Sequence, residues 1–88
     1  MDYDTDKLYD LTTREKNLLY WICKGKSLSE TGRNIDRTKE YVTQYLRRIC
    51  KKLDISLELS PPERRKILYD FFCPKLMEMA DEHEKSEG

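Results

Sequence analysis

Residues 38–53 constrain the fold most, because their apolar side chains recur at the spacing of one helix face. That face consists of Val42, Leu46, Ile49, Cys50 and Leu53. Residues three or four positions apart lie on one side of an α-helix, so the pattern predicts a helix packed on a core. The opposite face is polar and basic, with Thr43, Gln44, Arg47, Arg48 and Lys51. This face is either a solvated surface or a surface that meets an anionic partner.

Capping residues mark where the neighbouring helices begin and end. Residues 12–15 (Thr-Thr-Arg-Glu) and 27–30 (Ser-Leu-Ser-Glu) have the capping-box spacing, in which the first and fourth residues bind each other's backbone N–H groups. They predict a first helix that ends at Gly25 and a short second helix through about Asn34. Thr38 is placed to cap the amphipathic helix at about residues 39–53. A short helix, a turn and a longer basic helix predict a helix-turn-helix.

Two residues at the turn support this reading. Gly32 costs about 1 kcal/mol relative to alanine in a helix interior, which indicates that another helix approaches too closely for a Cβ atom. Asp36 tolerates the left-handed backbone conformation and predicts the turn at residues 36–37.

The C-terminal third predicts a further helix. Residues 60–63 form a third capping box with proline in the first turn. Pro74 has no N–H to donate to residue 70, so the helix should end or kink near Phe72 or Cys73 and resume by Leu76. The apolar side chains of this region predict a homodimer interface of Ile67, Leu68, Phe71, Phe72, Leu76 and Met79. Alternatively, Phe71 and Phe72 close the core of one chain.

Together these elements predict an all-α fold, a helix-turn-helix bundle of four to five helices with an extended C-terminal helical region. Residues 1–10 are expected to form an irregular acidic arm that Tyr3, Leu8 and Tyr9 pin to the domain. Residues 11–56 form the helix-turn-helix, and residues 57–88 form the C-terminal extension, expected to dimerise, with an acidic tail. The whole chain of 88 residues is the length of one domain.

Charge is distributed unevenly along the chain, although the formal net charge is zero. Residues 24–52 hold nine basic and three acidic residues, a net charge of +6, whereas residues 1–23 have −2 and residues 53–88 have −4. A basic patch can bind phosphate locally on a neutral molecule. No apolar run approaches the roughly 20 residues that span a bilayer, and the acidic N-terminus is unlike a secretory signal. We therefore expect a cytoplasmic protein without a membrane partner.

The three cysteines, Cys23, Cys50 and Cys73, have neither a CxxC motif nor a nearby histidine pair. An odd count in a cytosolic chain does not favour a disulfide framework, and zinc needs clustered ligands. We interpret all three as small core residues, and we expect no metal and no cofactor.

Residues 11–56 resemble the LuxR/FixJ-type DNA-binding domain. The opening LTTRE resembles the family's LTxRE, and Leu19, Gly25, Ser27 and Glu30 fall on family positions. The residues Val42, Ile49, Lys52 and Leu53 resemble the family's TVKxHxxxIxxKL run. The sequence departs from the pattern at Thr31 and Arg37, where the family usually has apolar core residues, and Tyr41, Thr43 and Tyr45 replace its Thr, Lys and His.

The resemblance implies that Thr43, Gln44 and Arg47 face the bases of the major groove. Arginine can pair bidentately with guanine, and glutamine with adenine. Candidates for phosphate contacts, which position a protein without reading sequence, are Lys26, Arg37, Lys39, Arg48 and Lys51. Tyr41 either donates its hydroxyl to a phosphate or simply packs.

These observations favour a stand-alone, sequence-specific transcription regulator that binds double-stranded DNA, as a homodimer and without a small-molecule ligand. The alternative is a protein-interaction module that binds another regulator or RNA polymerase through the same scaffold; a sigma-factor region-four domain is a close cousin of the first reading. An enzyme is not expected, because there is no Gly-rich phosphate loop and no Ser or Cys with a plausible histidine base.

Overall fold

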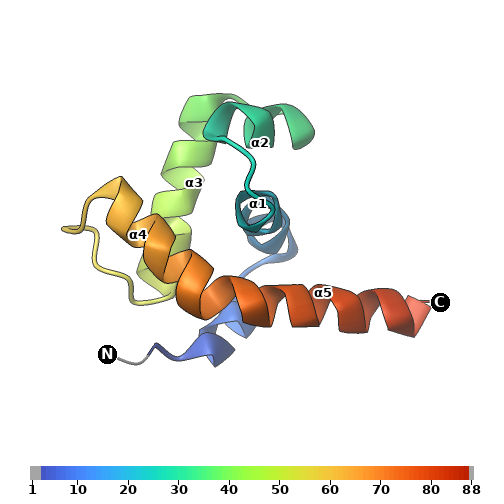
Figure 1. Ribbon diagram of the computed structural model, residues 1–88. Helices are drawn as coiled ribbons and strands as arrows, with labels where there is room; N and C mark the ends of the chain where they lie inside the picture. The colour runs from blue at the N-terminus through green and yellow to red at the C-terminus, as the bar shows by residue number, and fades with distance from the viewer. Residues whose placement is uncertain (1–2, 88) are drawn as a thin grey trace.

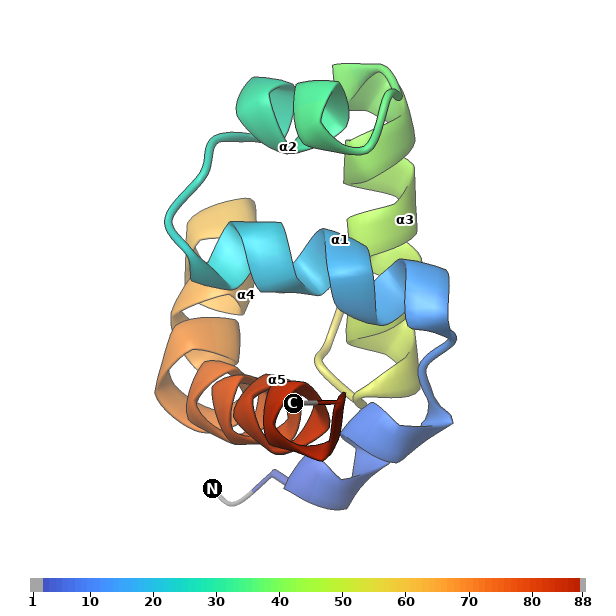
Figure 2. The ribbon, with the colours of Figure 1, turned by 90° about the vertical axis from the view of Figure 1, so that its right-hand side faces the viewer.

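A computed structural model describes the backbone of residues 3–87 and the side chains of residues 3–80. These residues form helices and no strand, which confirms the all-α prediction. The elements are listed in chain order (Figure 1): the 3-10 helix η1 (Thr5–Asp10), α1 (Thr13–Cys23), α2 (Leu28–Asn34), α3 (Lys39–Lys52), α4 (Pro61–Ile67), the π-helical turn η2 (Leu68–Phe72) and α5 (Cys73–Glu87). In Figure 2, α1 crosses in front of α4, α2 lies above it, and α3 runs along one side.

The predicted caps begin each of the first three α-helices. At α1, the Glu15 N–H donates to Thr12 Oγ1 over 3.1 Å and the Thr12 N–H donates to Glu15 Oε1 over 2.8 Å, so this capping box is complete. The box of Ser27 and Glu30 is also complete, and Thr38 caps α3. The third box is only half formed, because the Ser60 hydroxyl accepts from the Glu63 N–H but also donates to the Glu63 carboxylate.

Backbone geometry explains the turn between α2 and α3. Asp36 is left-handed, with φ of 58°, as predicted. The Arg37 N–H reaches back to the Gly32 carbonyl over 2.7 Å and closes the end of α2. A Cβ on Gly32 would lie 2.5 Å from the Arg37 carbonyl oxygen. Gly32 therefore permits a close approach, as expected, but the approaching group is the backbone of the turn and not another helix.

Every element except α2 and α4 contributes a buried apolar side chain to the core. Its fully buried members come from η1, α1, α3, the segment after α3, and η2: Leu8, Leu18, Leu19, Ile22, Val42, Ile49, Cys50, Leu53, Ile55, Leu68 and Phe72. Thr31 of α2 is also fully buried, and its Oγ1 has no hydrogen-bond partner among the described residues. A salt bridge of 2.7 Å between Lys52 and the buried Glu15 joins α3 to α1.

The N-terminal arm is more ordered than predicted. Residues 5–10 form η1, and Leu8 is completely buried in the core. The Tyr3 ring packs against Phe71 and Phe72, whereas Tyr9 is largely exposed, with the Lys75 ammonium of α5 5.9 Å from its ring centroid. Residues 1–2, the rest of the predicted arm, lie outside the described part of the chain.

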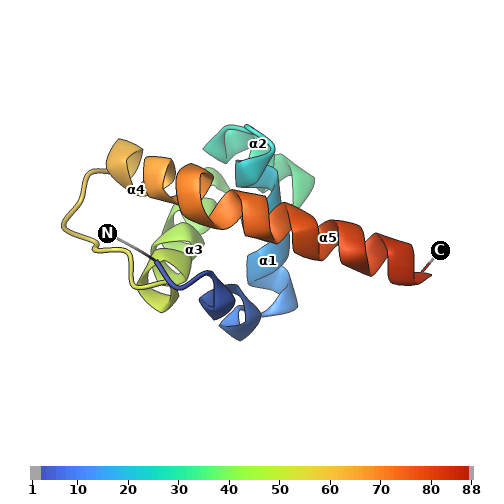
Figure 3. The same ribbon diagram turned by 60° about the horizontal axis from the view of Figure 1, so that its bottom comes forward.

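The C-terminal helices form one continuous run. Instead of ending before Pro74, the helix widens into η2, where the Cys73 N–H donates to the Leu68 carbonyl five residues back. This wider turn lies directly before Pro74, which has no N–H to donate to the Asp70 carbonyl. The run changes direction at this point, and the far half of α5 extends beyond the other helices (Figures 1 and 3).

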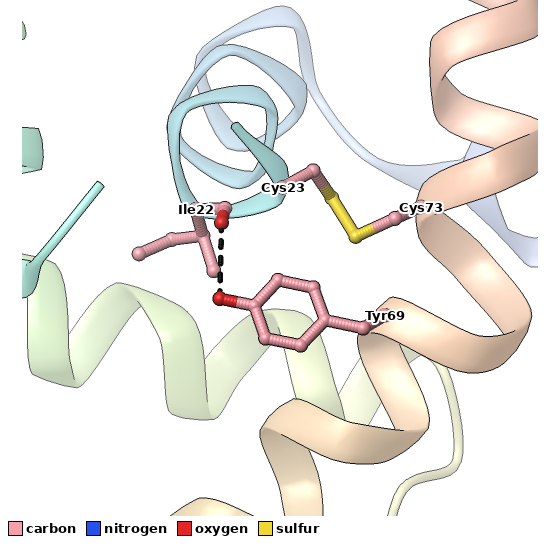
Figure 4. The surroundings of a disulfide bond; sticks show 4 residues. All are labelled: Ile22, Cys23, Tyr69 and Cys73. Atoms are coloured by element: carbon pink, nitrogen blue, oxygen red, sulfur yellow. Dashed lines mark hydrogen bonds between the residues drawn. A yellow bond between two sulfur atoms is a disulfide. The ribbon is translucent and has the colours of Figure 1, made fainter. Parts of the chain in front are cut away.

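A disulfide corrects the interpretation of the cysteines. Cys23, at the end of α1, is bonded to Cys73, at the start of α5, with a Cα–Cα distance of 5.6 Å (Figure 4). Beside the disulfide, the Tyr69 hydroxyl donates to the Ile22 carbonyl over 3.2 Å. A disulfide and a hydrogen bond therefore both join the end of α1 to the C-terminal run of helices. The prediction was wrong for this pair because their proximity depends on the tertiary packing of segments 50 residues apart. Cys50 is a buried free thiol, as predicted.

The predicted dimer surface also needs correction. Leu68, Phe72 and Leu76 are buried in the core of the single chain, so they are not available to a second copy. Ile67 and Met79 are half-buried against that core, and Phe71 is 37% exposed. The alternative, that these aromatic residues close the core, is confirmed for Phe72. Within the described residues, no helix is both long enough and apolar enough to span a membrane.

Candidate nucleic-acid interface

Helix α3 is held by its apolar face and presents the other face to solvent. Val42, Ile49 and Leu53 are fully buried, and Leu46 is half-buried. Because an α-helix turns 100° per residue, burial of these positions directs the residues between them outward. The exposed positions of α3 include Lys39, Glu40, Thr43, Gln44, Arg47, Arg48 and Lys51. Glu40 is the only acidic residue in that set.

The three predicted base-contacting residues lie along this exposed face. Thr43 donates its hydroxyl hydrogen to the Lys39 carbonyl over 3.0 Å, which leaves its methyl group and the oxygen lone pairs free for a partner. Gln44 and Arg47 make no hydrogen bond to another side chain of residues 3–80, and both side chains are exposed. An amide and a guanidinium without internal partners can each offer a bidentate contact to a base edge.

Two tyrosines form a stacked pair on the edge of α3 that faces α1. The rings of Tyr41 and Tyr45 are 4.5 Å apart and nearly parallel. The guanidinium of Arg37 lies 5.3 Å from the Tyr41 ring, and that of Arg48 lies 5.4 Å from the Tyr45 ring. The Tyr41 ring thus packs on the Tyr45 ring, and the pKa of Tyr41 is lowered first by a hydrogen bond with Tyr45, then by the guanidinium groups of Arg37 and Arg14.

The remaining candidates for phosphate contacts lie on α3 itself or in the segments that precede it. Arg48, Lys51 and Lys39 are exposed on α3 itself, and Arg37 is exposed in the turn before it. Lys26 is exposed in the α1–α2 connection, two residues before Leu28. Leu28 lines a pocket together with Thr43 and Arg47, which places this connection beside the same edge of α3.

Three arginines that the sequence interpretation did not include also border α3. Arg14, in the first turn of α1, lies next to the tyrosine pair, and hydrogen bonds with Tyr45 and Tyr41 raise its pKa. Arg64 and Arg65 of α4 line the pocket that includes Thr43 and Arg47. The run Arg64-Arg65-Lys66 is visible in the sequence, but its position beside α3 depends on how α4 folds back. Cationic side chains from α1 and α4 thus flank α3 on both sides.

Comparison with known proteins gives no match: no family model, no curated protein and no solved structure aligns with this chain. The likeness to the LuxR/FixJ domain therefore depends on the residues and spacings of the sequence alone.

Proposed function

We propose that this protein is a sequence-specific, double-stranded DNA-binding transcription regulator of the LuxR/FixJ type, with α3 in the major groove. The observation that supports this most is the exposed face of α3. It offers Thr43, Gln44 and Arg47 without side-chain partners among residues 3–80, on a helix anchored by its opposite face. A helix of this width fits the major groove, where each base pair presents a distinct pattern of donors and acceptors.

The side chains divide into two roles. Arg47 and Gln44 read base edges, and Thr43 contacts a neighbouring base through its methyl group or oxygen. The basic side chains around them bind phosphates and set the register of the protein on the duplex: Arg14, Lys26, Arg37, Lys39, Arg48 and Lys51. The stacked rings of Tyr41 and Tyr45 help to position three of these arginines. The guanidinium groups of Arg37 and Arg48 lie against the rings, and Arg14 hydrogen-bonds with both tyrosines.

Selection of binding sites from a random duplex pool tests the proposal. We expect enrichment of a defined site, and a palindrome in that site would indicate a two-fold dimer. Arg47→Ala should lose discrimination at one base pair, worth about 1–3 kcal/mol, whereas Lys51→Ala should weaken all sequences alike. Lys66→Ala, which removes a charge from α4 where the ammonium pairs with Asp70, is the matched control. Unchanged site selection by Arg47→Ala would show that α3 is not the reading helix.

A second candidate is a protein-interaction module that binds RNA polymerase, another regulator or a second copy of the chain. The observation in its favour is a pair of exposed aromatic side chains on η2, Tyr69 and Phe71, which are 39% and 37% exposed. This function predicts no DNA retardation even at low salt, where phosphate contacts are strongest, together with a tight protein partner that Phe71→Ser releases. Light scattering at micromolar concentration decides whether that partner is a second copy.

A further inference from the structure

A pocket of about 120 Å³ lies between α3 and α4, with the start of α2 at one end. Its apolar lining consists of Leu28, Leu46, Cys50, Pro61 and Leu68. A closed apolar cavity of about 150 Å³ is known to accommodate benzene, so this open pocket has room for about one six-membered ring or a short alkyl chain. The rest of the lining is polar and cationic: Thr43, Arg47, Arg64 and Arg65.

The floor of the pocket is uncharged. Leu68 and Cys50 are 0% and 1% exposed, and neither offers a charged group. Burial raises the pKa of the Cys50 thiol, although the Arg64 guanidinium partly opposes this, so the sulfur is protonated at neutral pH. An apolar group is therefore favoured on this floor over a charged one, since a charge would lose its hydration there.

The rim has the opposite character. Arg47, Arg64 and Arg65 line this pocket, and none of them forms a salt bridge with a carboxylate of residues 3–80. Arginines without a carboxylate partner are available to bind an anion. A guanidinium also matches the two oxygens of a carboxylate or phosphate in a bidentate contact.

We propose that this pocket binds a small amphipathic anion, with a ring or short alkyl group on the Leu46–Cys50–Leu68 floor and a carboxylate or phosphate against Arg47, Arg64 and Arg65. The size of the pocket limits the apolar part, and the arginines determine the charge of the head group. The sequence analysis expected no small-molecule ligand, and Arg64 and Arg65 come to lie beside Arg47 only through the tertiary packing of α4.

Occupation of the pocket affects α3 directly. Arg47 and Thr43 belong both to the pocket lining and to the base-reading set. A bound anion would hold the Arg47 guanidinium and neutralise part of the surface that faces phosphates, so the ligand should weaken DNA binding. This competition depends on the proposed DNA-binding function, whereas binding of the anion does not.

Titration of the full chain with small probes tests the proposal, with amide chemical shifts and calorimetry as readouts. Benzoate and phenyl phosphate combine a ring with an anion, benzyl alcohol has the ring without charge, and acetate and inorganic phosphate have the charge without a ring. We expect at least one phenyl anion to bind at least tenfold more tightly than all three partial probes, with shifts centred on Leu46, Cys50 and Leu68. Equal affinities, or shifts centred elsewhere, would overturn the pocket assignment.

Matched variants on α4 test the role of the rim. Arg64→Gln and Arg65→Gln should each weaken binding of the phenyl anion at least fivefold, whereas Lys66→Gln, which removes the same charge outside the pocket, should change it less than twofold. Leu46→Phe fills the pocket and should abolish binding, with far-UV circular dichroism to verify the fold. A uniform effect of all three charge variants would indicate a non-specific electrostatic attraction and refute the site. DNA retardation is measured separately, so that failure of DNA binding leaves the anion titration interpretable.

Discussion

The Glu15 carboxylate connects two helices through one oxygen atom. Its Oε1 accepts the Thr12 N–H at the start of α1 and the Lys52 ammonium at the end of α3, over 2.8 and 2.7 Å. Burial raises the pKa of this carboxyl, but the hydrogen bonds from Lys52 and Thr12 outweigh burial and leave the pKa below its ordinary value of 4.5. The stability from this lowered pKa is therefore complete above pH 4.5 and is lost as the pH falls through the folded-state value.

Glu15→Gln should lower the free energy of unfolding by about 1–3 kcal/mol at pH 7, because a charged hydrogen bond to a buried group is lost. The difference from the wild type should shrink as the pH falls from 4.5 through the lowered folded-state pKa, because the carboxylate becomes protonated there. Urea denaturation at several pH values measures this. Glu30→Gln, the matching residue of α2 without a lysine partner in the described structure, should cost only about 0.5 kcal/mol. Equal costs for the two variants would argue against a contribution from Lys52.

Thr31 has the only fully buried hydroxyl that lacks a hydrogen-bond partner within the described residues. Valine has nearly the same shape without the unsatisfied oxygen. Thr31→Val should therefore stabilise the protein by about 1 kcal/mol, since desolvation of an unpaired polar group costs about 1–3 kcal/mol. Thermal denaturation measures the change. Thr43→Val, at an exposed and hydrogen-bonded threonine, should give no gain, and a loss at Thr31 would mean that its hydroxyl has a partner such as a buried water.

At the scale of elements, the α2–α3 turn requires that residue 32 has no Cβ atom. Helix propensity alone predicts that Gly32→Ala gains about 1 kcal/mol. The structure predicts a net loss of about 1–3 kcal/mol, because the new Cβ would lie 2.5 Å from the Arg37 carbonyl oxygen. Gly25→Ala is the control for backbone strain without a steric clash. The φ of 86° at Gly25 strains any side chain, but no atom lies within 4 Å of the new Cβ. Stabilisation by Gly32→Ala would show that the turn can move away.

The link between α1 and α5 gives another prediction at this scale. Closing a loop of 50 residues by a disulfide stabilises a protein by about 4 kcal/mol in the chain-entropy treatment, which is an upper value. Reduction, or Cys23→Ser with Cys73→Ser, should lower the free energy of unfolding by up to this amount. The experiment uses a Cys50→Ala background, so that only the disulfide responds to reductant. The double serine variant should be insensitive to reductant, and an insensitive parent would show that the bond does not form in solution.

Sequence patterns predicted the helices well because the patterns are local. Capping boxes at Thr12 and Ser27, the Thr38 cap and the left-handed Asp36 involve residues within a few positions of one another. The apolar period of α3 likewise identified its buried face. By contrast, η1 is a short 3-10 helix without a periodic pattern, and it is stabilised by burial of Leu8 against distant helices.

Features that depend on distant contacts could not be predicted. The Cys23–Cys73 pair, the burial of Leu68 and the return of α4 toward α3 all depend on how the C-terminal run folds back. The candidate site divides in the same way. Residues on α3 were found from its period, whereas Arg14 and the α4 arginines join the site only in three dimensions.

At the scale of the whole molecule, positive charge gathers around α3 although the formal net charge of the chain is zero. Affinity for DNA should therefore fall steeply as salt rises, because each phosphate contact releases a counterion. Arg14→Ala should weaken binding to all sequences alike and reduce the slope of log K against log salt by about 1. Fluorescence anisotropy at several salt concentrations measures the slope. With Lys66→Ala as the control, equal slopes for the two variants would remove Arg14 from the interface.

The π-helical turn η2 gives the chain a place where it can lose a residue. A turn of this kind holds about one residue more than an ordinary α turn. Deleting one residue between Leu68 and Phe72 would convert η2 into a regular α turn, and later side chains would keep nearly the same angle around the axis. Leu76 would then still face the core, and Cys73 would still face Cys23. Related chains with this architecture should therefore accept the loss of one residue in this turn more readily than the loss of one residue in the middle of α1 or α3, where every later side chain would rotate by about 100°.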